Sequence, residues 1–271
     1  MAHEGSYNVS TYHRDLESEL HRLKFQVELS WAKESRNLQW LGLTDGMSVL
    51  ELGSGPGFTT QKLLSLIPHG HITTVDIDPI MVEHAQTMLV SSATRLTSLQ
   101  ASATQTGLPD NCMDFAVARL LFQHLPDPVA VAQEAFRVLK PGGTLAITDV
   151  DADVFWLFDP PIPELSFIGE KMTQGQAGQG GDRQIGRKLW RMLKEVGFEN
   201  LNLDLLAANS DDLGMQAFLP QLNPDLLQPL VQTGLISTED LSQLRHSRES
   251  FMNAPHAFAL LVWFMVSGQK T

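Results

Sequence analysis

A glycine-rich segment at residues 49–60, VLELGSGPGFTT, constrains the fold of this chain more than any other stretch. An apolar run at residues 47–52 leads into glycines at positions 53, 55 and 57, and a helical pattern follows over residues 59–67. Because glycine carries no side chain and tolerates positive φ, such a turn lets backbone N–H groups and a helix N-terminus approach a ligand closely. The segment therefore predicts a strand, a ligand-binding turn and the start of a helix.

A second predicted strand, residues 71–75, ends at Asp76. An acid at the tip of the second strand of a βαβ unit can accept hydrogen bonds from both hydroxyls of a ribose. Dinucleotide-binding enzymes use the spacing G-x-G-x-x-G, whereas here the third glycine is Gly57 and Phe58 follows it. The spacing thus favours a nucleoside-binding unit and disfavours a nicotinamide-dependent oxidoreductase.

The remaining chain alternates predicted strands and helices, which indicates an α/β protein with a Rossmann-like, doubly wound, seven-stranded sheet. Residues 1–45 are predicted to form an N-terminal helical cap, residues 46–271 the main domain, and residues 209–254 a helical insertion within it. The aromatic cluster at residues 155–158 is interpreted either as core or as the lining of an apolar pocket. The seven predicted strands span residues 47–52, 71–75, 96–101, 115–121, 144–148, 198–206 and 257–267.

Composition limits the partners that we expect. The formal net charge is −12, from 31 acidic and 19 basic residues, and so acidic a surface disfavours binding to a nucleic acid. The single cysteine, Cys112, suits a reducing cytoplasm. We expect no signal peptide, no membrane partner, because the most apolar run is too short to span a bilayer, and no metal site, because the nine histidines are scattered.

Several separated stretches resemble, in order, the class I S-adenosylmethionine (SAM) methyltransferases. ELGSGPG resembles their motif I, with Glu51 in the acidic position, and VDIDPIMVEHA resembles the ribose-binding strand with the helix after it. QHLPDPVAVAQEAFRVLKPGGTLAITD is similar to the turn, helix and strand that follow, and GRKLWRMLKEVGFENL to the late helix and sixth strand. The resemblance spans residues 47–206, and the two ends of the chain look like the small-molecule branch that carries an N-terminal helical cap.

This resemblance implies a set of cofactor-binding residues. Asp76 would bind the ribose, Ile77 would lie against the adenine, and Ala103 would offer its backbone N–H to the adenine ring. Ser102 stands where the family commonly has an acid, so this contact departs from the pattern. The methionine part of SAM would be held by the backbone around Gly53, Ser54, Gly55 and Arg119, and its carboxylate by Arg22 and Gln26.

Several of these residues have a second interpretation. Arg22 and Gln26 lie one helical turn apart and equally fit a solvated helix face. Arg119 equally fits an ion pair with the acidic residues nearby, Glu51 an ordinary loop acid, and Ile77 a core position at the end of a longer strand.

Three residues are candidates for proton transfer during catalysis. His124 follows the fourth predicted strand, and a histidine that titrates near neutrality is a common general base. It equally fits a structural residue that orders the turn at residues 123–126. Tyr12 and His13, in the predicted cap, would close over the site.

The sequence therefore predicts a SAM-dependent methyltransferase that methylates an oxygen or nitrogen atom of a small, partly apolar, specialised metabolite, with S-adenosylhomocysteine as the second product. A carbon acceptor and a non-catalytic SAM-binding protein are the alternatives that remain.

Overall fold

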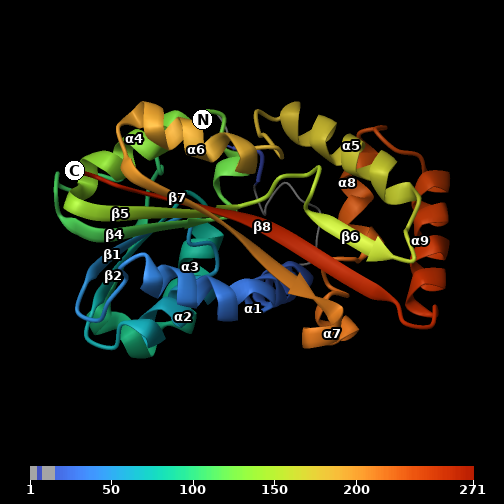
Figure 1. Cartoon of the computed structure of the whole chain (residues 1–271), viewed down its shortest axis with the longest axis horizontal. Helices are drawn as coiled ribbons and strands as arrows, with labels where there is room; N and C mark the ends of the chain where they lie inside the picture. The colour runs from blue at the N-terminus through green and yellow to red at the C-terminus, as the bar shows by residue number, and fades with distance from the viewer. Residues whose placement is uncertain (1–4, 8–15) are drawn as a thin grey trace.

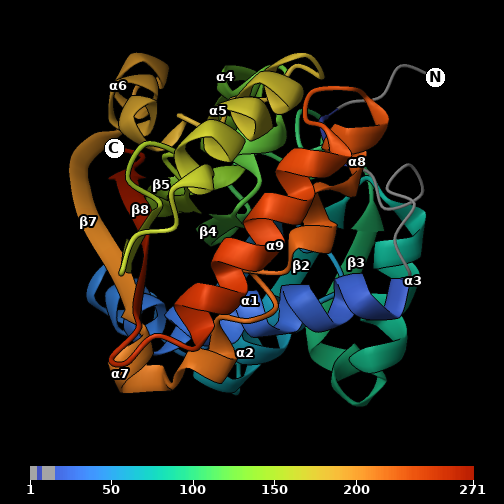
Figure 2. The same cartoon turned by 90° about the vertical axis from the view of Figure 1, so that its right-hand side faces the viewer.

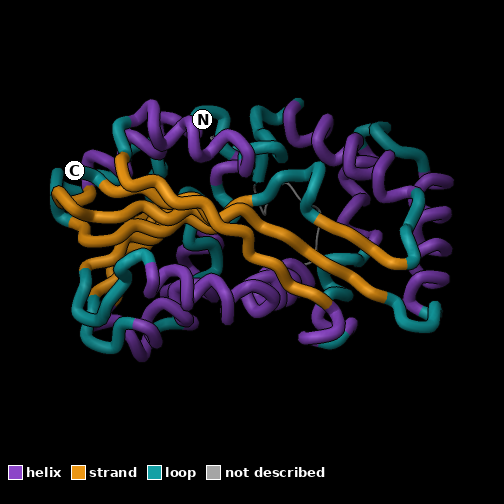
Figure 3. Tube along the Cα trace, viewed as in Figure 1, coloured by secondary structure: helices purple, strands orange, loops and turns teal. Residues whose placement is uncertain are grey.

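The centre of the fold is a mostly parallel sheet of eight strands with helices on both faces (Figure 1, Figure 3). The structure is a computed structural model that describes residues 5–7 and 16–271. The strands are β1 (Ser48–Leu52), β2 (His71–Asp76), β3 (Leu96–Gln100), β4 (Met113–Arg119), β5 (Leu139–Asp149), β6 (Trp156–Asp159), β7 (Glu199–Asn209) and β8 (Phe258–Gln269).

Helices α1, α2 and α3 lie on one face of the sheet, and α4 and α6 on the other (Figure 1). The helices of this main body are α1 (Leu16–Trp40), α2 (Phe58–Leu66), α3 (Pro79–Met88), α4 (Pro128–Val138) and α6 (Gly186–Val196), with short 3₁₀ turns η1 (Val90–Arg95) and η2 (Phe122–His124). Asp78 and Asp127 cap α3 and α4, each followed by proline at the first helical position, an arrangement that suits the unpaired N–H groups of a helix start.

The strand order is β3-β2-β1-β4-β5-β8, and β8 runs antiparallel to its neighbours. Strand β7 pairs with one edge of β8 over most of its length. The opposite edge of β8 pairs first with β6 and then with β5. The order reverses between β1 and β4, and ligands in doubly wound sheets bind at the carboxyl ends of the strands beside such a switch point. The predicted doubly wound architecture is confirmed.

The sheet departs from the predicted strands in two places. The eighth strand, β6, was not predicted, because it has four residues and the prolines that follow it indicated an irregular segment. Strand β5 begins at Leu139, so Lys140-Pro141-Gly142-Gly143 lies within it instead of separating it from α4. Hydrogen bonds in both directions between Gly142–Gly143 and Lys270 hold this irregular start to the end of β8.

Alternate residues of each central strand supply two separate cores. Val49 and Phe115 pack with α1 and α2 on one face, while Leu50 and Ala116 pack with α4 and α6 on the other. Both faces are buried, as expected for strands covered by helices on either side. The central strands are therefore fixed in register, and so are the loops at their carboxyl ends.

A second group of helices extends the fold beyond the carboxyl ends of the strands (Figure 2). It comprises α5 (Glu164–Ala177), α7 (Ser210–Leu213), η3 (Met215–Ala217), η4 (Pro224–Leu227), α8 (Gln228–Gln232) and α9 (Thr238–Met252). Helix α9 begins with a reciprocal capping box between Ser237 and Asp240. Across residues 5–7 and 16–271, no helix has both the length and the apolar character that crossing a bilayer requires.

Candidate functional site

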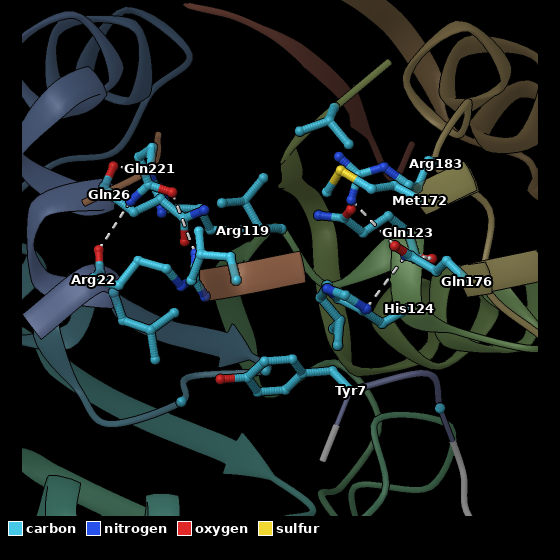
Figure 4. Close-up of a pocket in the computed structure, with 18 of the residues that line it drawn as sticks. Tyr7, Arg22, Gln26, Arg119, Gln123, His124, Met172, Gln176, Arg183 and Gln221 are labelled. Atoms are coloured by element: carbon cyan, nitrogen blue, oxygen red, sulfur yellow. Dashed lines mark hydrogen bonds between the residues drawn. The ribbon is translucent and has the colours of Figure 1, made fainter. Parts of the chain in front are cut away.

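A cavity of about 390 Å³ opens at the carboxyl ends of the central strands. Its walls come from α1, the glycine loop, the turn after β4, and the helices beyond the sheet. In Figure 4 Arg22, Gln26, Arg119 and Gln221 lie on one side, and His124, Gln123, Met172, Gln176 and Arg183 on the other, with Tyr7 between them. Segments that are far apart in the sequence thus meet around one space.

The glycine loop and Asp76 form one end of this cavity. Gly53 donates its N–H to the carbonyl of Val75 at 2.8 Å, which ties the loop to the end of β2. The Asp76 carboxylate accepts hydrogen bonds from the backbone N–H of Gly55 at 2.7 Å and of Asp78 at 2.9 Å. Burial raises the pKa of Asp76 while these N–H groups act in the opposite direction. Ser54 and the half-exposed Ile77 line the cavity beside them.

Helix α1 supplies the facing wall through Arg22 and Gln26. The Arg22 guanidinium donates two hydrogen bonds to Glu19, at 2.6 and 3.0 Å, and a longer one to the Gln221 side chain at 3.3 Å. The Gln221 amide in turn donates to the Arg22 carbonyl at 3.0 Å. Arg22 is therefore held in place and faces the cavity rather than bulk solvent.

Arg119, at the end of β4, is held by α1. Its guanidinium donates to Glu34 at 3.0 Å, to the Ser30 hydroxyl at 3.0 Å and to the carbonyl of Gln26 at 2.7 Å. The Arg119 and Glu34 side chains are 8% and 4% exposed, so this is a buried ion pair. Arg119 thus forms an ion pair, but with an acid of α1 and not with the acidic residues nearby in the sequence, and it also lines the cavity.

Leu120, next to Arg119, has a φ of 54° and lines the cavity. Its N–H donates to the carbonyl of Thr148 at 2.7 Å, which holds this left-handed conformation. Residues with such backbone strain occur often at functional sites. No sequence signal marks this position, because leucine rarely adopts positive φ.

Three residues assigned to the cofactor by resemblance do not line the cavity. Glu51 is buried beneath the glycine loop and accepts a hydrogen bond from Thr60 at 2.6 Å, and burial raises its pKa to about 8. Ser102 and Ala103 lie after β3, where the Ser102 hydroxyl contacts Thr104 at 2.7 Å. Glu51, Ser102 and Ala103 are therefore not part of the cavity wall. The predicted residues Tyr12 and His13 fall outside the described residues.

His124 lies on the opposite side of the cavity from α1. Its Nδ1 atom is 2.9 Å from the Ser6 hydroxyl and 3.3 Å from the Gln176 amide nitrogen, and the Tyr7 ring lies 5.4 Å away. Burial, together with the charges of Arg183 and Arg22, lowers the pKa of His124 to about 3. The imidazole is therefore neutral at physiological pH. His124 lines the cavity, but a pKa lowered this far does not fit the predicted proton acceptor that titrates near neutrality.

The turn that carries His124 is held in place by a hydrogen bond to Asp149. The buried carboxylate of Asp149 accepts hydrogen bonds from the N–H groups of Gln123 at 3.1 Å and Val150 at 2.8 Å. Burial raises the pKa of Asp149 to about 7, against the effect of these donors. The acid thus supports the cavity wall without entering it.

The other end of the cavity is mostly apolar and comes from residues that sequence analysis largely missed. Phe155 and Trp156, of the aromatic cluster that fits either core or pocket, do line it. The polar residues Tyr7, Gln176, Arg183 and Gln221 belong to segments with no chemical motif, so only the tertiary fold brings them together. The further apolar lining consists of Val150, Met172, Leu222, Leu226, Leu227, Leu230, Leu235 and Leu261.

Comparison with known proteins places the chain in a family. Residues 50–147 match the family described as a methyltransferase domain. An uncharacterised methyltransferase of Bacillus subtilis, YdaC, is 32% identical over 177 residues, which cover 64% of this chain and 85% of that protein. The demethylmenaquinone methyltransferase of Listeria monocytogenes is 28% identical over 129 residues, which cover 47% of this chain and 54% of that protein.

A solved structure extends the comparison to the whole fold. Phosphoethanolamine N-methyltransferase 2 of Haemonchus contortus superposes with a TM-score of 0.62 at 16% identity, over 96% of this chain and 59% of that one. This chain spans about half the length of the first curated relatives it matches. The likeness of sequence and fold, with the glycine loop and Asp76 at the switch point, shows that the chain belongs to the class I SAM-dependent methyltransferases.

Proposed function

We propose that this protein transfers the methyl group of SAM to an oxygen or nitrogen atom of a small, partly apolar molecule of the specialised-metabolite type. The observation that carries the proposal is that one cavity joins the glycine loop and Asp76 at one end to apolar residues such as Trp156 at the other. A methyl donor and an acceptor bound at the two ends would meet inside this one cavity.

The residues at the first end fit SAM. A Cβ built on Gly55 meets no atom within 4 Å, so the backbone there faces open space, and the Asp76 carboxylate lines the same region. Asp76 would accept from the ribose hydroxyls, Ile77 would cover one face of the adenine, and the loop from Gly53 would receive the methionine part. When bound, SAM supplies a methyl group on a positively charged sulfur, which is a good leaving group.

The chain's own contribution to the reaction is mainly positioning. Holding a nucleophile in line with a bound electrophile at near contact removes a large part of a barrier. Because Nδ1 of His124 lies against the Gln176 amide nitrogen, which can only donate, the neutral imidazole carries its proton on Nε2 and would donate a hydrogen bond to the acceptor atom, which orients it. Its pKa of about 3 makes it a weak proton acceptor, so proton removal depends on the acceptor's own acidity and on nearby charges.

The lining of the second end supports a small and partly apolar substrate. Leucine, methionine and aromatic side chains dominate it, with a few polar groups among them, which is the usual composition of a small-molecule site. The similar Haemonchus structure is named for phosphoethanolamine and the similar Listeria protein for demethylmenaquinone, which are different substrates. The substrate class is therefore proposed from the lining of the cavity.

Calorimetric titration with S-adenosylhomocysteine and with NADH tests the proposal. We expect binding of the first and none of the second. In Asp76→Asn, the loss of a charged acceptor is expected to cost about 1.5–3 kcal/mol, or roughly 10- to 150-fold in Kd. The control is Asp211→Asn, an exposed acid outside the cavity. Binding of NADH instead, or equal affinity of both variants for S-adenosylhomocysteine, would contradict the proposal.

A further inference from the structure

Helix α9 carries an arginine on its buried face. The buried residues of this helix are Leu241, Leu244 and Phe251, which recur at helical spacing. Arg248 stands on the same stripe, one turn after Leu244 and one turn before Phe251. A helix that packs against the rest of a fold usually has an apolar residue at such a position, so the guanidinium here requires a separate explanation.

Arg248 and Leu244 line a side cavity of about 50 Å³. Its other walls are mostly apolar, and Trp156, Met172 and Leu227 line both this space and the main cavity of about 390 Å³. The aliphatic stem of an arginine suits an apolar wall of this kind, because the stem can be buried while the charged end reaches a polar group. An apolar body that starts in the main cavity can therefore continue along these shared side chains toward Arg248.

The polar residues that line the side cavity differ in what they bind. Gln221 exchanges hydrogen bonds with Arg22, and the side-chain oxygen of Asn223 accepts from the N–H of Asp225. The buried Nε atom of Arg248 has no hydrogen-bond partner, and its guanidinium forms no ion pair with any residue that the structure describes. A buried donor without an acceptor is costly, so Arg248 offers a hydrogen bond that these residues do not use.

The guanidinium of α9 also borders a polar outer cleft of about 780 Å³. Two acids of that cleft bind other arginines, since Glu19 pairs with Arg22 and Asp225 with Arg245, each at 2.6 Å. A third acid of the cleft, Glu17, is exposed to solvent. The guanidinium thus lies between an apolar space and a hydrated one, which allows its charge to stay solvated while its unused donor is available to a ligand.

These observations name a substrate class, and the inference rests on the proposed function. We propose that the methyl acceptor is an elongated amphipathic molecule whose far end carries a carboxylate or carbonyl oxygen that accepts a hydrogen bond from Arg248. Its apolar body lies along Trp156, Met172 and Leu227, and its methylated atom lies at the opposite end, in the main cavity. A guanidinium suits such an oxygen because charge-assisted hydrogen bonds are stronger than those between neutral groups.

Such a contact selects substrates by their length. A molecule that is too short does not reach Arg248 from the main cavity, and one that is too long places its oxygen beyond the guanidinium. A purely apolar site behaves differently, because each further methylene group that is buried adds a similar increment of affinity. An optimum length for molecules with the far oxygen, which molecules without it do not share, is therefore the signature of the proposed contact.

Probes of three lengths test this contact: 6-hydroxyhexanoate, 8-hydroxyoctanoate and 10-hydroxydecanoate. Their methyl esters keep a neutral carbonyl oxygen at the far end, and 1-hexanol, 1-octanol and 1-decanol have no oxygen there. Each is titrated into the protein saturated with S-adenosylhomocysteine, whose own binding is measured first. The variants are Arg248→Met, which has an apolar stem without donors, Arg248→Lys, which keeps a charge, and Arg191→Met, at an exposed arginine of α6 outside these cavities. Urea unfolding shows whether each variant is folded.

We expect the hydroxy acid of one length, or its ester, to bind the wild type about 10- to 100-fold more tightly than the alkanol of that length. Comparison of the acid with the ester separates a carboxylate from a carbonyl as the source of the oxygen. The preference should fall to about onefold in Arg248→Met, be reduced in Arg248→Lys and stay unchanged in Arg191→Met.

Equal affinities of acid, ester and alkanol at every length, binding of no probe at all, or a preference that survives in a folded Arg248→Met would each overturn the inference. If Arg248→Met does not fold, an undiminished preference in Arg248→Lys would overturn it. Failure of S-adenosylhomocysteine to bind would instead overturn the proposed function.

Discussion

Replacing Gly55 and Gly57 by alanine, one at a time, is expected to separate cofactor binding from folding. Both residues have positive φ, 53° and 89°, so alanine costs about 1–2 kcal/mol at either position for the backbone alone. What differs is the space around the added Cβ.

At Gly57 the Cβ would lie 3.0 Å from Ala85 Cβ and 3.2 Å from Ala85 Cα, in the backbone of α3. A helix backbone cannot move aside as a flexible side chain can, and overpacking typically costs a further 1–3 kcal/mol or so. The total expected loss for Gly57→Ala is therefore about 2–5 kcal/mol. At Gly55 no atom lies within 4 Å of the Cβ, so the loss stays near about 1–2 kcal/mol, but the methyl group projects into space that the proposed cofactor needs.

Urea unfolding measures the first effect and calorimetry with S-adenosylhomocysteine the second. Gly55→Ala should fold with a small loss of stability and bind at least about tenfold more weakly, a change of about 1.4 kcal/mol. Gly46→Ala is the control, because its φ is 84°, its Cβ meets no atom and it lies outside the cavity. If Gly55→Ala bound with the wild-type Kd, the cofactor would not approach this backbone. If Gly57→Ala were no less stable than Gly46→Ala, the packing argument at Ala85 would be wrong.

Two further predictions concern the buried charges. Glu34→Gln leaves the Arg119 guanidinium buried without its ion-pair partner, so we expect the free energy of unfolding to fall by about 3–5 kcal/mol; a loss below about 1 kcal/mol in urea unfolding would show that the pair is not desolvated. Burial raises the pKa of Glu51 to about 8 and that of Asp149 to about 7. The stability that their neutral forms provide is therefore fully present below about pH 4, near the pKa values of the unfolded chain. It is lost as the pH rises through 7–8. Glu51→Gln should therefore flatten the decline in unfolding free energy between pH 5 and 8, and parallel curves for variant and wild type would contradict this.

The parts of the fold that sequence could predict are those fixed by local chemistry. Asp78 and Asp127, each followed by proline, marked the starts of α3 and α4 correctly, because an N-cap is made by residues within one turn of each other. Gly197 likewise ends α6 in a left-handed conformation. The strand and the glycine-rich turn could also be predicted, since the apolar run and the glycines follow one another directly in the sequence.

The apolar end of the cavity was not predictable, because its residues have no local signature. Gln176, Arg183 and Gln221 are ordinary polar residues in helical or irregular segments, and only long-range packing brings them to one cavity. Strand β6 illustrates the same limit, since its four residues become a strand only through pairing with β8. In physical terms, these features depend on tertiary contacts that no pattern within a short window encodes.

The position of Arg119 links the two ends of the cavity. Its backbone belongs to β4, which is packed in the centre of the sheet, while its guanidinium is bound by three groups of α1. Helix α1 in turn carries Arg22, whose carbonyl and side chain are both bonded to Gln221 beyond the sheet. A buried ion pair is costly to break, so Arg119 fixes α1 to the sheet beside the glycine loop. Through its hydrogen bonds to Gln221, α1 is also tied to the segment beyond the sheet. The sheet, α1 and the segment that carries Gln221 together therefore set the distance between the glycine-loop end and the apolar end of the cavity.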